Sequence, residues 1–243
     1  MESPAGKSFA LGLIKAAKTY RAMLDMGLLP QHALQAVESI TPLTSIERQL
    51  LLRCISSRLE SEDNFKKIVD LREAYGKSLA IDLFNVAITI AEAFEGYPIF
   101  RCTDGLTRDL AASYGRSKKD PSSLMEAVKA VAETLVVYPP KRIVLVADRQ
   151  ISFSGERIAE AEGVLSSVSQ VEARLSDTAD SELIRLSSEG TIISSSDVVI
   201  VKKSRSILDL PKHVFVNRRI YGKNVIDMNY IIASLGMLTF SPL

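Results

Sequence analysis

The sequence predicts a three-layer α/β domain with a mainly parallel sheet, preceded by a small all-α N-terminal domain. Helical periodicity fills residues 1–75, whereas strand-length apolar runs alternate with helical segments over residues 76–243. Several of these runs lead directly into an aspartate. The length of 243 residues is enough for one large domain or two small ones, so we place the boundary between residues 1–75 and 76–243.

Composition limits the chemistry. Thirty Lys and Arg against 29 Asp and Glu leave a formal charge of +1, so a polyanion site requires a local basic patch. No apolar run is long enough to span a membrane and no signal-peptide pattern is found, so we expect a cytoplasmic protein without membrane contact. The two cysteines fit a reduced compartment. With two histidines and two cysteines, a catalytic metal must rest on carboxylates, which favours Mg²⁺ or Mn²⁺.

Three helices are predicted at the start of the chain. They cover residues 9–26, residues 31–39 and a segment after Thr44, where Glu47 completes a capping box. A charged segment at residues 60–73 follows. Short helices joined by tight turns are compatible with a helix-turn-helix that binds DNA, but such bundles more often only pack. Their surface is also a candidate site for a protein partner.

The second part of the chain alternates strands with helices. Strands are predicted at residues 79–81, 99–102, 143–146, 171–175, 191–194 and 214–216. Helices are predicted at residues 84–94, 106–113, 121–137, 155–164, 179–187 and 227–235. This alternation is typical of a parallel sheet with helices on both faces.

Four of the apolar strands run into acidic residues, namely Asp82, Asp104, Asp148 and Asp197, and Asp180 lies in the first turn of a helix. Parallel strands all emerge at one edge of their sheet, so aspartates far apart in the sequence can meet there. Aspartate is also a favoured helix N-cap, which explains any one position without a function. For the whole set, mutual repulsion at one edge favours a divalent cation that neutralises it.

Several short motifs resemble those of a known superfamily. Residues 81–86, IDLFNV, resemble the first motif of the PIN-like nucleases, especially the NYN branch, where a strand ends in Asp-Gly-x-Asn-Val. Residues 178–184 resemble the acidic helix of that superfamily, and residues 192–197 resemble its next strand, which ends in Thr/Ser-x-Asp. Leu83 stands where the motif has glycine, so its bulk is expected to alter substrate access or metal geometry.

The whole chain resembles a family of uncharacterised, mostly archaeal proteins that join a helical N-terminal domain to a PIN-like domain. Residues 103–110 and 148–156 carry runs typical of that family. The resemblance implies Mg²⁺- or Mn²⁺-dependent hydrolysis of phosphodiester bonds, with RNA as the substrate. It implies that the metal is held by Asp82 and Asp197, with Asp148, Asp180 and Asp104 as further candidates. Asn85 would orient a carboxylate or a water, and Asp109 is interpreted as a partner of Arg108 or a lysine.

Two basic clusters flank these positions. They are interpreted either as solvated surface or as a rim that binds RNA phosphates, and they comprise Arg116, Lys118 and Lys119, then Lys202, Lys203 and Arg205. A catalytically inert module of the same fold that binds RNA or a protein is the main alternative to a nuclease, and a small-molecule phosphohydrolase is a third. Complete P-loop, nucleophile-elbow and dinucleotide-binding motifs are absent.

Overall fold

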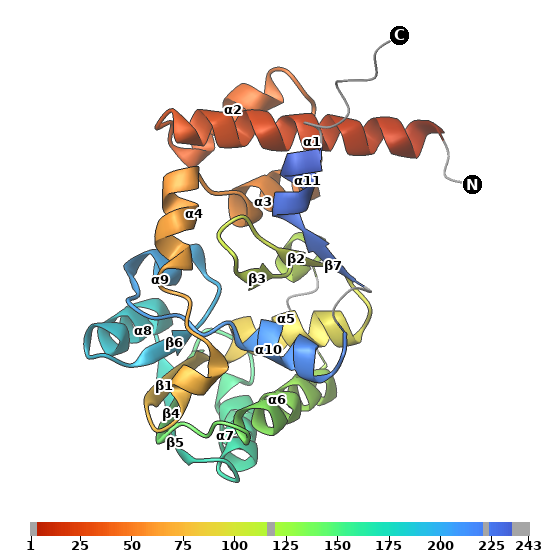
Figure 1. The fold of residues 1–243 in the computed structure, drawn as a ribbon. Coiled ribbons are helices and arrows are strands. Elements are labelled where there is room, and N and C mark those ends of the chain that lie inside the picture. The colour runs from red at the N-terminus through yellow and green to blue at the C-terminus, as the bar shows by residue number, and fades with distance from the viewer. Residues whose placement is uncertain (1–3, 116–119, 221–223, 235–243) are drawn as a thin grey trace.

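The computed structural model describes residues 4–115, 120–220 and 224–234, which have a mixed α/β architecture (Figure 1). One sheet has four strands, all parallel. In spatial order these are β5 (Gln170–Ser176), β4 (Arg142–Asp148), β1 (Ser78–Asp82) and β6 (Ile192–Ser194). The predicted parallel sheet is therefore confirmed, and the strands leading to Asp82, Asp148 and Asp197 are neighbours in it.

The order of the strands creates a topological switch point. From β1 the chain passes to β4 and then to β5 on one side, whereas β6 returns to the opposite side of β1. The pairing of Ile81 with Ser194 brings the end of β1 beside the end of β6. Open α/β sheets bind ligands in the crevice outside the carboxyl ends of the strands at such a point. The topology therefore predicts a binding site at the segments that follow β1 and β6.

Helices cover both faces of this sheet. One face carries α5 (Leu83–Phe94), α6 (Pro121–Leu135), α7 (Ser154–Leu165) and α10 (Leu210–Asn217), and the other carries α8 (Ala179–Ser188) and α9 (Val198–Lys203). On β1, Leu79 and Ile81 pack with the first group, whereas Ala80 packs with the second. This division follows from the two-residue period of a strand, which sends successive side chains to opposite faces.

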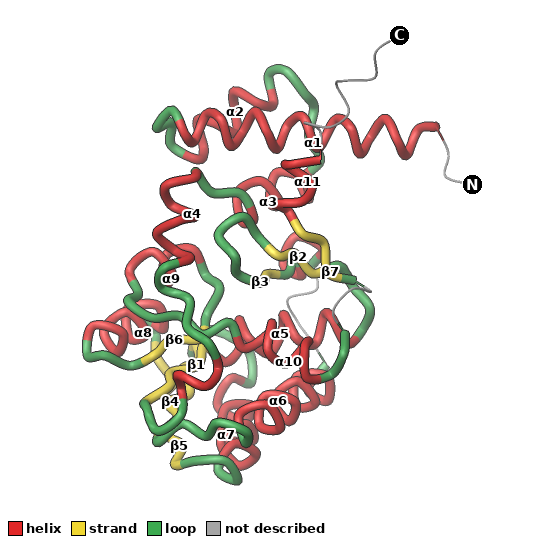
Figure 2. Tube along the Cα trace, in the orientation of Figure 1, coloured by secondary structure: helices red, strands yellow, loops and turns green. Residues whose placement is uncertain are grey.

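A second, small sheet lies apart from the first, beside the N-terminal helices (Figure 2). Its strands are, in spatial order, β3 (Thr107–Arg108), β2 (Ile99–Arg101) and β7 (Val225–Asp227). The neighbouring helices are α1 (Pro4–Asp25), α2 (Pro30–Glu38), α3 (Ser45–Cys54), α4 (Arg58–Phe65) and α11 (Met228–Ser234). Phe100 and Met228 share one apolar cluster with α1, α2 and α3, so helices from before residue 76 and segments from after it form a common core.

The two cysteines meet in this common core. Cys54 ends α3, Cys102 follows β2, and both thiols are free and buried. Burial and a hydrogen bond with the Cys102 side chain raise the pKa of Cys54 well above its usual value.

The capping box of α3 is confirmed, since the Thr44 side chain accepts from the Glu47 backbone N–H and Glu47 accepts from the Thr44 backbone N–H. Among the described residues, no helix is long and apolar enough to cross a membrane.

Two element predictions are wrong. The helix expected at residues 106–113 is instead strand β3 and a 3₁₀ turn at Ala111–Tyr114. Here Asp104 Oδ1 accepts from Leu106 N and Asp109 Oδ1 accepts from Ala111 N, and such side-chain bonds compete with a helix. The strand expected at residues 214–216 lies within α10, because Asp209 caps that helix through Lys212 N. Val214 and Val216 are β-branched and favour a strand when each residue is considered alone, but this preference depends on context and does not prevent the helix.

Other elements depart from the expected pattern less severely. Helices α4 and α9, strand β7 and a 3₁₀ turn at Leu71–Ala74 were not predicted. The charged segment forms α4 because the Ser57 side chain accepts from Glu60 N at the N-cap. The strand predicted at residues 99–102 exists as β2 but belongs to the second sheet. Its following aspartate, Asp104, therefore does not emerge at the edge of the parallel sheet.

Candidate functional site

The carboxyl-terminal edge of the parallel sheet gathers four of the predicted aspartates. Asp82 ends β1, Asp148 ends β4, Asp197 follows β6, and Asp180 lies in the first turn of α8. Burial, followed by the charges of Asp197 and Asp148, raises the pKa of Asp180. The charges of Asp197 and Asp180 likewise contribute to a raised pKa at Asp82. We call these four residues the acidic edge: Asp82, Asp180 and Asp197 repel one another, and Asp148 adds to the repulsion at Asp180.

Asp82 is the most perturbed carboxyl group of the acidic edge. Its Oδ1 accepts a 3.4 Å hydrogen bond from Asn85 N, and its Oδ2 accepts a 2.8 Å bond from Ser195 Oγ. Burial raises the pKa of Asp82 to about 7, against the effect of these two bonds and with a further contribution from Asp197 and Asp180. Perturbation by burial and by like charges in one crevice is typical of functional sites.

Replacing Asp82 with Asn is expected to stabilise the metal-free protein at alkaline pH. The pKa of Asp82 rises from 3.8 to about 7 on folding, so the folded state binds the extra proton between these values. The contribution of Asp82 to the free energy of unfolding is therefore fully present below about pH 4. It is lost as the pH rises from about 4 through 7. Because Asp82 as a whole residue is only half-buried, we expect Asp82→Asn to gain about 1–3 kcal/mol at pH 8. Urea unfolding with EDTA measures this, and an equal gain at pH 4 and pH 8 would contradict it.

The loop after β6 is held against Asp82 by Asn85. Asn85 Oδ1 accepts hydrogen bonds from Ser196 N at 2.9 Å and from Ser196 Oγ at 3.0 Å. Ser195 Oγ in turn accepts from Asp197 N at 3.2 Å and donates to Asp82. The predicted role of Asn85 was to orient a carboxylate or a water, and the structure shows it orienting this loop. Ser195 and Ser196 were not predicted as site residues, although a serine run between a buried strand and an aspartate was a usable signal.

Backbone N–H groups occupy only one oxygen of Asp148, in the turn after β4, and only one oxygen of Asp197, which is the N-cap of α9. Asp148 Oδ1 accepts from Gln150 N, and Asp197 Oδ1 accepts from the backbone N–H groups of the first turn of α9. No residue in the described part of the chain donates a hydrogen bond to Oδ2 of Asp148 or Asp197, or to Asp180. The capping interpretation therefore holds for Asp197 and not for Asp148, and in both carboxylates the bonds to the backbone leave the second oxygen available.

A buried ion pair supports the serine loop. Arg108 donates to Asp104 Oδ1 and Oδ2 at 2.8 and 2.7 Å, and Arg108 Nε donates to Ser196 O at 2.7 Å. The two side chains are 1% and 2% exposed. Asp104, predicted as a metal ligand, is thus neutralised by Arg108 and lies away from the acidic edge. Asp109 does not pair with Arg108 as expected, because its carboxylate accepts from Thr89 Oγ1 and Ala111 N.

Leu83 lies in the core. It is 4% exposed and packs between α5 and the sheet, with Ala87 and Val128 among its neighbours. The expectation that Leu83 adds bulk to the crevice is therefore not supported, since this first residue of α5 sends its side chain into the apolar layer. The chain accommodates leucine at the glycine position of the motif without filling the space beside Asp82.

Only part of the predicted basic clusters lies within the described residues. Arg116, Lys118 and Lys119 are outside the described residues. Lys202 and Lys203 are exposed at the far end of α9, about 8 Å along the helix from Asp197. Lys67 Nζ donates to the carbonyls of Val201 and Lys202, so it caps that end. A phosphate-binding rim therefore stays a prediction for these positions.

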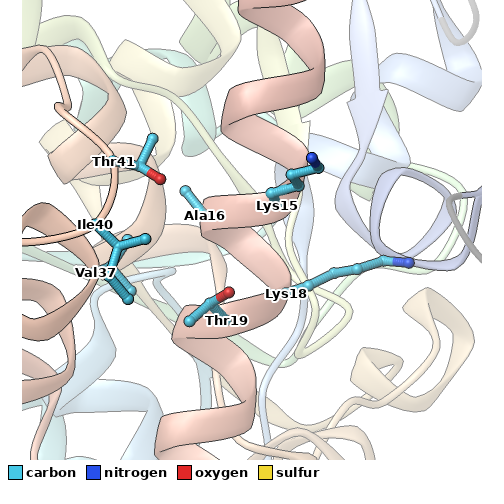
Figure 3. A pocket seen from close by; sticks show the side chains of 7 residues that line it. All are labelled: Lys15, Ala16, Lys18, Thr19, Val37, Ile40 and Thr41. Atoms are coloured by element: carbon cyan, nitrogen blue, oxygen red, sulfur yellow. The ribbon is translucent and has the colours of Figure 1, made fainter.

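A cavity of about 370 Å³ lies elsewhere, between α1 and α2 (Figure 3). Its lining includes Lys15, Lys18, Val37 and Ile40. In Figure 3 both lysine side chains extend away from Val37 and Ile40, so their ammonium groups do not converge on a shared ligand. The cavity therefore lacks the convergent polar groups of a specific small-molecule site.

The residues of the acidic edge fit a hydrated hard cation. No group of three or more His, Cys, Asp or Glu side chains in the described ranges is arranged to hold a metal ion by itself. Mg²⁺ commonly keeps several waters and takes only one or two carboxylates from the protein. Asp82 and the uncapped oxygens of Asp148 and Asp197 supply donors of that type. Their mutual repulsion also favours a divalent cation.

Comparisons with known proteins identify a protein family whose model matches this chain. The family model for a domain of unknown function, DUF5616, matches residues 71–213, which include all four strands of the parallel sheet. Uncharacterized protein MJ0935 of Methanocaldococcus jannaschii is 28% identical over 145 residues, which are 60% of this chain and 69% of that protein. No solved structure matches the chain significantly.

Proposed function

We propose, starting from the fact that the chain belongs to the DUF5616 family, that it is a PIN-like nuclease that hydrolyses phosphodiester bonds in RNA. The observation that carries this proposal is the acidic edge. Asp82, Asp180 and Asp197 repel one another at the switch point of a parallel sheet, and Asp148 adds to the repulsion at Asp180. None of the four forms an ion pair with a described residue. Such an arrangement costs stability unless a cation binds there.

Topology and motif order support the PIN-like assignment. The motif at residues 81–86 ends the central strand β1, and the motif at residues 192–197 ends the neighbouring β6. The acidic helix of the resemblance, residues 178–184, coincides with the start of α8. The three motifs that resemble PIN-like nucleases are therefore together at one edge, as a shared active site requires.

Each residue of the site has a definable role. When bound, Mg²⁺ or Mn²⁺ would polarise the scissile phosphate and lower the pKa of a water. Asp82 and Asp197 would hold the ion, with Asp148 and Asp180 as further oxygen donors. Ser195 fixes the orientation of the Asp82 carboxylate, and Asn85 fixes the loop that carries Asp197. The Arg108–Asp104 pair anchors that loop from the interior.

Mn²⁺ is expected to raise the melting temperature of the wild-type protein. A ligand that binds only the folded state stabilises it, by about 2.7 kcal/mol at a concentration of 100 Kd. The double variant Asp82→Asn/Asp197→Asn should lose that gain, because two of the proposed ligands become amides. Differential scanning fluorimetry with and without millimolar Mn²⁺ measures the shift.

Asp63→Asn is the matched control for this titration. Asp63 is an exposed aspartate on α4, paired with Lys66, and lies outside the acidic edge. Its variant should respond to Mn²⁺ as the wild type does. The absence of any shift in the wild type, or the same shift in the double variant, would count against a metal site at the acidic edge.

A binding module without catalysis is the second candidate, and one observation favours it. The helical part of the chain exposes four large apolar side chains: Met26, Leu29, Ile40 and Leu59, each 65–71% exposed. A protein partner that covered side chains of this kind would remove their apolar surface from water, which is favourable. A protein partner at the N-terminal helices is compatible with either candidate, so RNA cleavage distinguishes the two.

A further inference from the structure

The loop after Asp148 carries an aromatic side chain that the fold does not require. Phe153 is 67% exposed and has a φ of 61°, in the left-handed region. That conformation costs a non-glycine residue about 1–2 kcal/mol. Phe153 is also the N-cap of α7, where its side chain makes none of the capping bonds that Ser, Thr, Asp or Asn would make. Backbone strain, capping and hydration all disfavour phenylalanine here.

The loop holds Phe153 in this exposed position. Gln150 N donates to Asp148 Oδ1 at 2.8 Å, and Ser154 N donates to Ile151 O at 3.0 Å. Arg149 N donates to Ser176 O at 3.0 Å, which ties the loop to the end of β5. Ile151 packs against the core, whereas Phe153 remains in solvent. Strain that the surroundings maintain is characteristic of ligand-binding positions.

The other residues of this loop indicate the type of ligand. The loop begins at Asp148, which belongs to the acidic edge. Phe153 is five residues further along the chain, in a compact turn. Arg149 is 60% exposed on the same loop, with its guanidinium 3.7 Å from Asp177. An exposed ring together with a cation is the combination that binds unpaired nucleotides, because the base stacks on the ring and the phosphate contacts the cation. Bases in a duplex are already stacked and are not available.

We propose that Phe153 stacks on an unpaired base of an RNA strand that lies along the acidic edge, with Arg149 contacting the phosphate of that nucleotide. The choice of RNA rests on the proposed function. The ring makes the site selective for single strands, because only an unpaired base offers its face. It also places the strand on the β4 side of the acidic edge.

An indole at position 153 reports this stacking directly. The chain contains no tryptophan, so Phe153→Trp introduces the sole indole. Titration with a short single-stranded oligoadenylate in EDTA should quench its fluorescence, and annealing the complementary strand should reverse the quenching. EDTA keeps the RNA intact, so the measurement is independent of cleavage.

Truncation of the ring is the second arm of the experiment. Phe153→Ala should weaken oligoadenylate binding about 5- to 150-fold, the range for loss of one stacked base. Tyr75→Ala is the matched control, since Tyr75 is 65% exposed just before β1, at the opposite edge of the same sheet, and should bind as the wild type does. Phe153→Gly should melt at a higher temperature than Phe153→Ala, because glycine adopts positive φ without strain.

The outcomes separate this inference from the proposed function. If Phe153→Ala binds as tightly as the wild type, or if the indole is not quenched by RNA that does bind, the stacking proposal is wrong even when the protein cleaves RNA. Quenching without any metal-dependent cleavage would support stacking and contradict the nuclease. The stacking proposal would also be overturned if the wild type bound no oligoadenylate. The same holds if Tyr75→Ala weakened binding as much as Phe153→Ala does.

Discussion

Asp82→Asn is expected to reduce Mn²⁺-dependent cleavage of single-stranded RNA by about 10³-fold or more. Asp82 stands at the centre of the acidic edge, between the strands that lead to Asp148 and Asp197. Loss of its charge removes a proposed metal ligand, and a loss of about 4 kcal/mol of transition-state stabilisation gives that factor. Asn has nearly the same shape as Asp, so its amide oxygen can accept from Asn85 N while its amide nitrogen donates to Ser195 Oγ. Single-turnover rates on labelled RNA at saturating protein measure the effect.

RNA binding should not decrease in the same variant. Affinity for RNA depends mainly on Lys and Arg contacts with phosphates, and removing a negative charge near them does not weaken those contacts. Fluorescence anisotropy in EDTA measures binding without cleavage, and Asp63→Asn serves as the control for both assays. Equal cleavage by wild type and Asp82→Asn would contradict the assigned site. A wild type that binds RNA but does not cleave it with either Mg²⁺ or Mn²⁺ would favour the inert binding module.

Arg108→Ala is expected to lower the free energy of unfolding by about 3–5 kcal/mol. The Asp104 carboxylate, 2% exposed, would lose both of its Arg108 hydrogen bonds and remain buried as an unpaired charge. The Ser196 carbonyl would lose its donor as well. Urea unfolding at pH 7 measures the change.

Two further variants isolate the contribution of this pair. Arg108→Met/Asp104→Leu removes both charges and should recover much of the lost stability. Arg185→Ala, at an exposed arginine of α8 that pairs with Glu182 and Glu189, should cost less than about 1 kcal/mol. If Arg108→Ala costs no more than Arg185→Ala, the buried pair does not anchor the serine loop.

The sequence by itself determined the features that depend on short stretches of chain. Residues 79–81 and 143–146 form central strands because continuous apolar runs of that length fit a sheet covered on both faces. Thr44 and Glu47 start a helix because both partners of the capping box lie within four residues. Four of the five predicted acidic positions share one edge because parallel strands end on the same side.

Tertiary structure alone decided the partners of side chains far apart in the sequence. Asp104 follows an apolar strand as Asp82 does, yet β2 joins a different sheet and Arg108 neutralises Asp104. Leu83 occupies the glycine position of the motif, and only the packing of α5 shows that its side chain enters the core.

The contacts that shape the acidic edge cross long stretches of chain. Ser196 is 111 residues from Asn85 and 88 from Arg108, and its hydrogen bonds with these two residues hold the residue that precedes Asp197. Periodicity and capping act over a few residues, and so they indicate where strands and helices form. Which strand is a neighbour, and which carboxylate is neutralised, depends on the free energy of the whole packed arrangement.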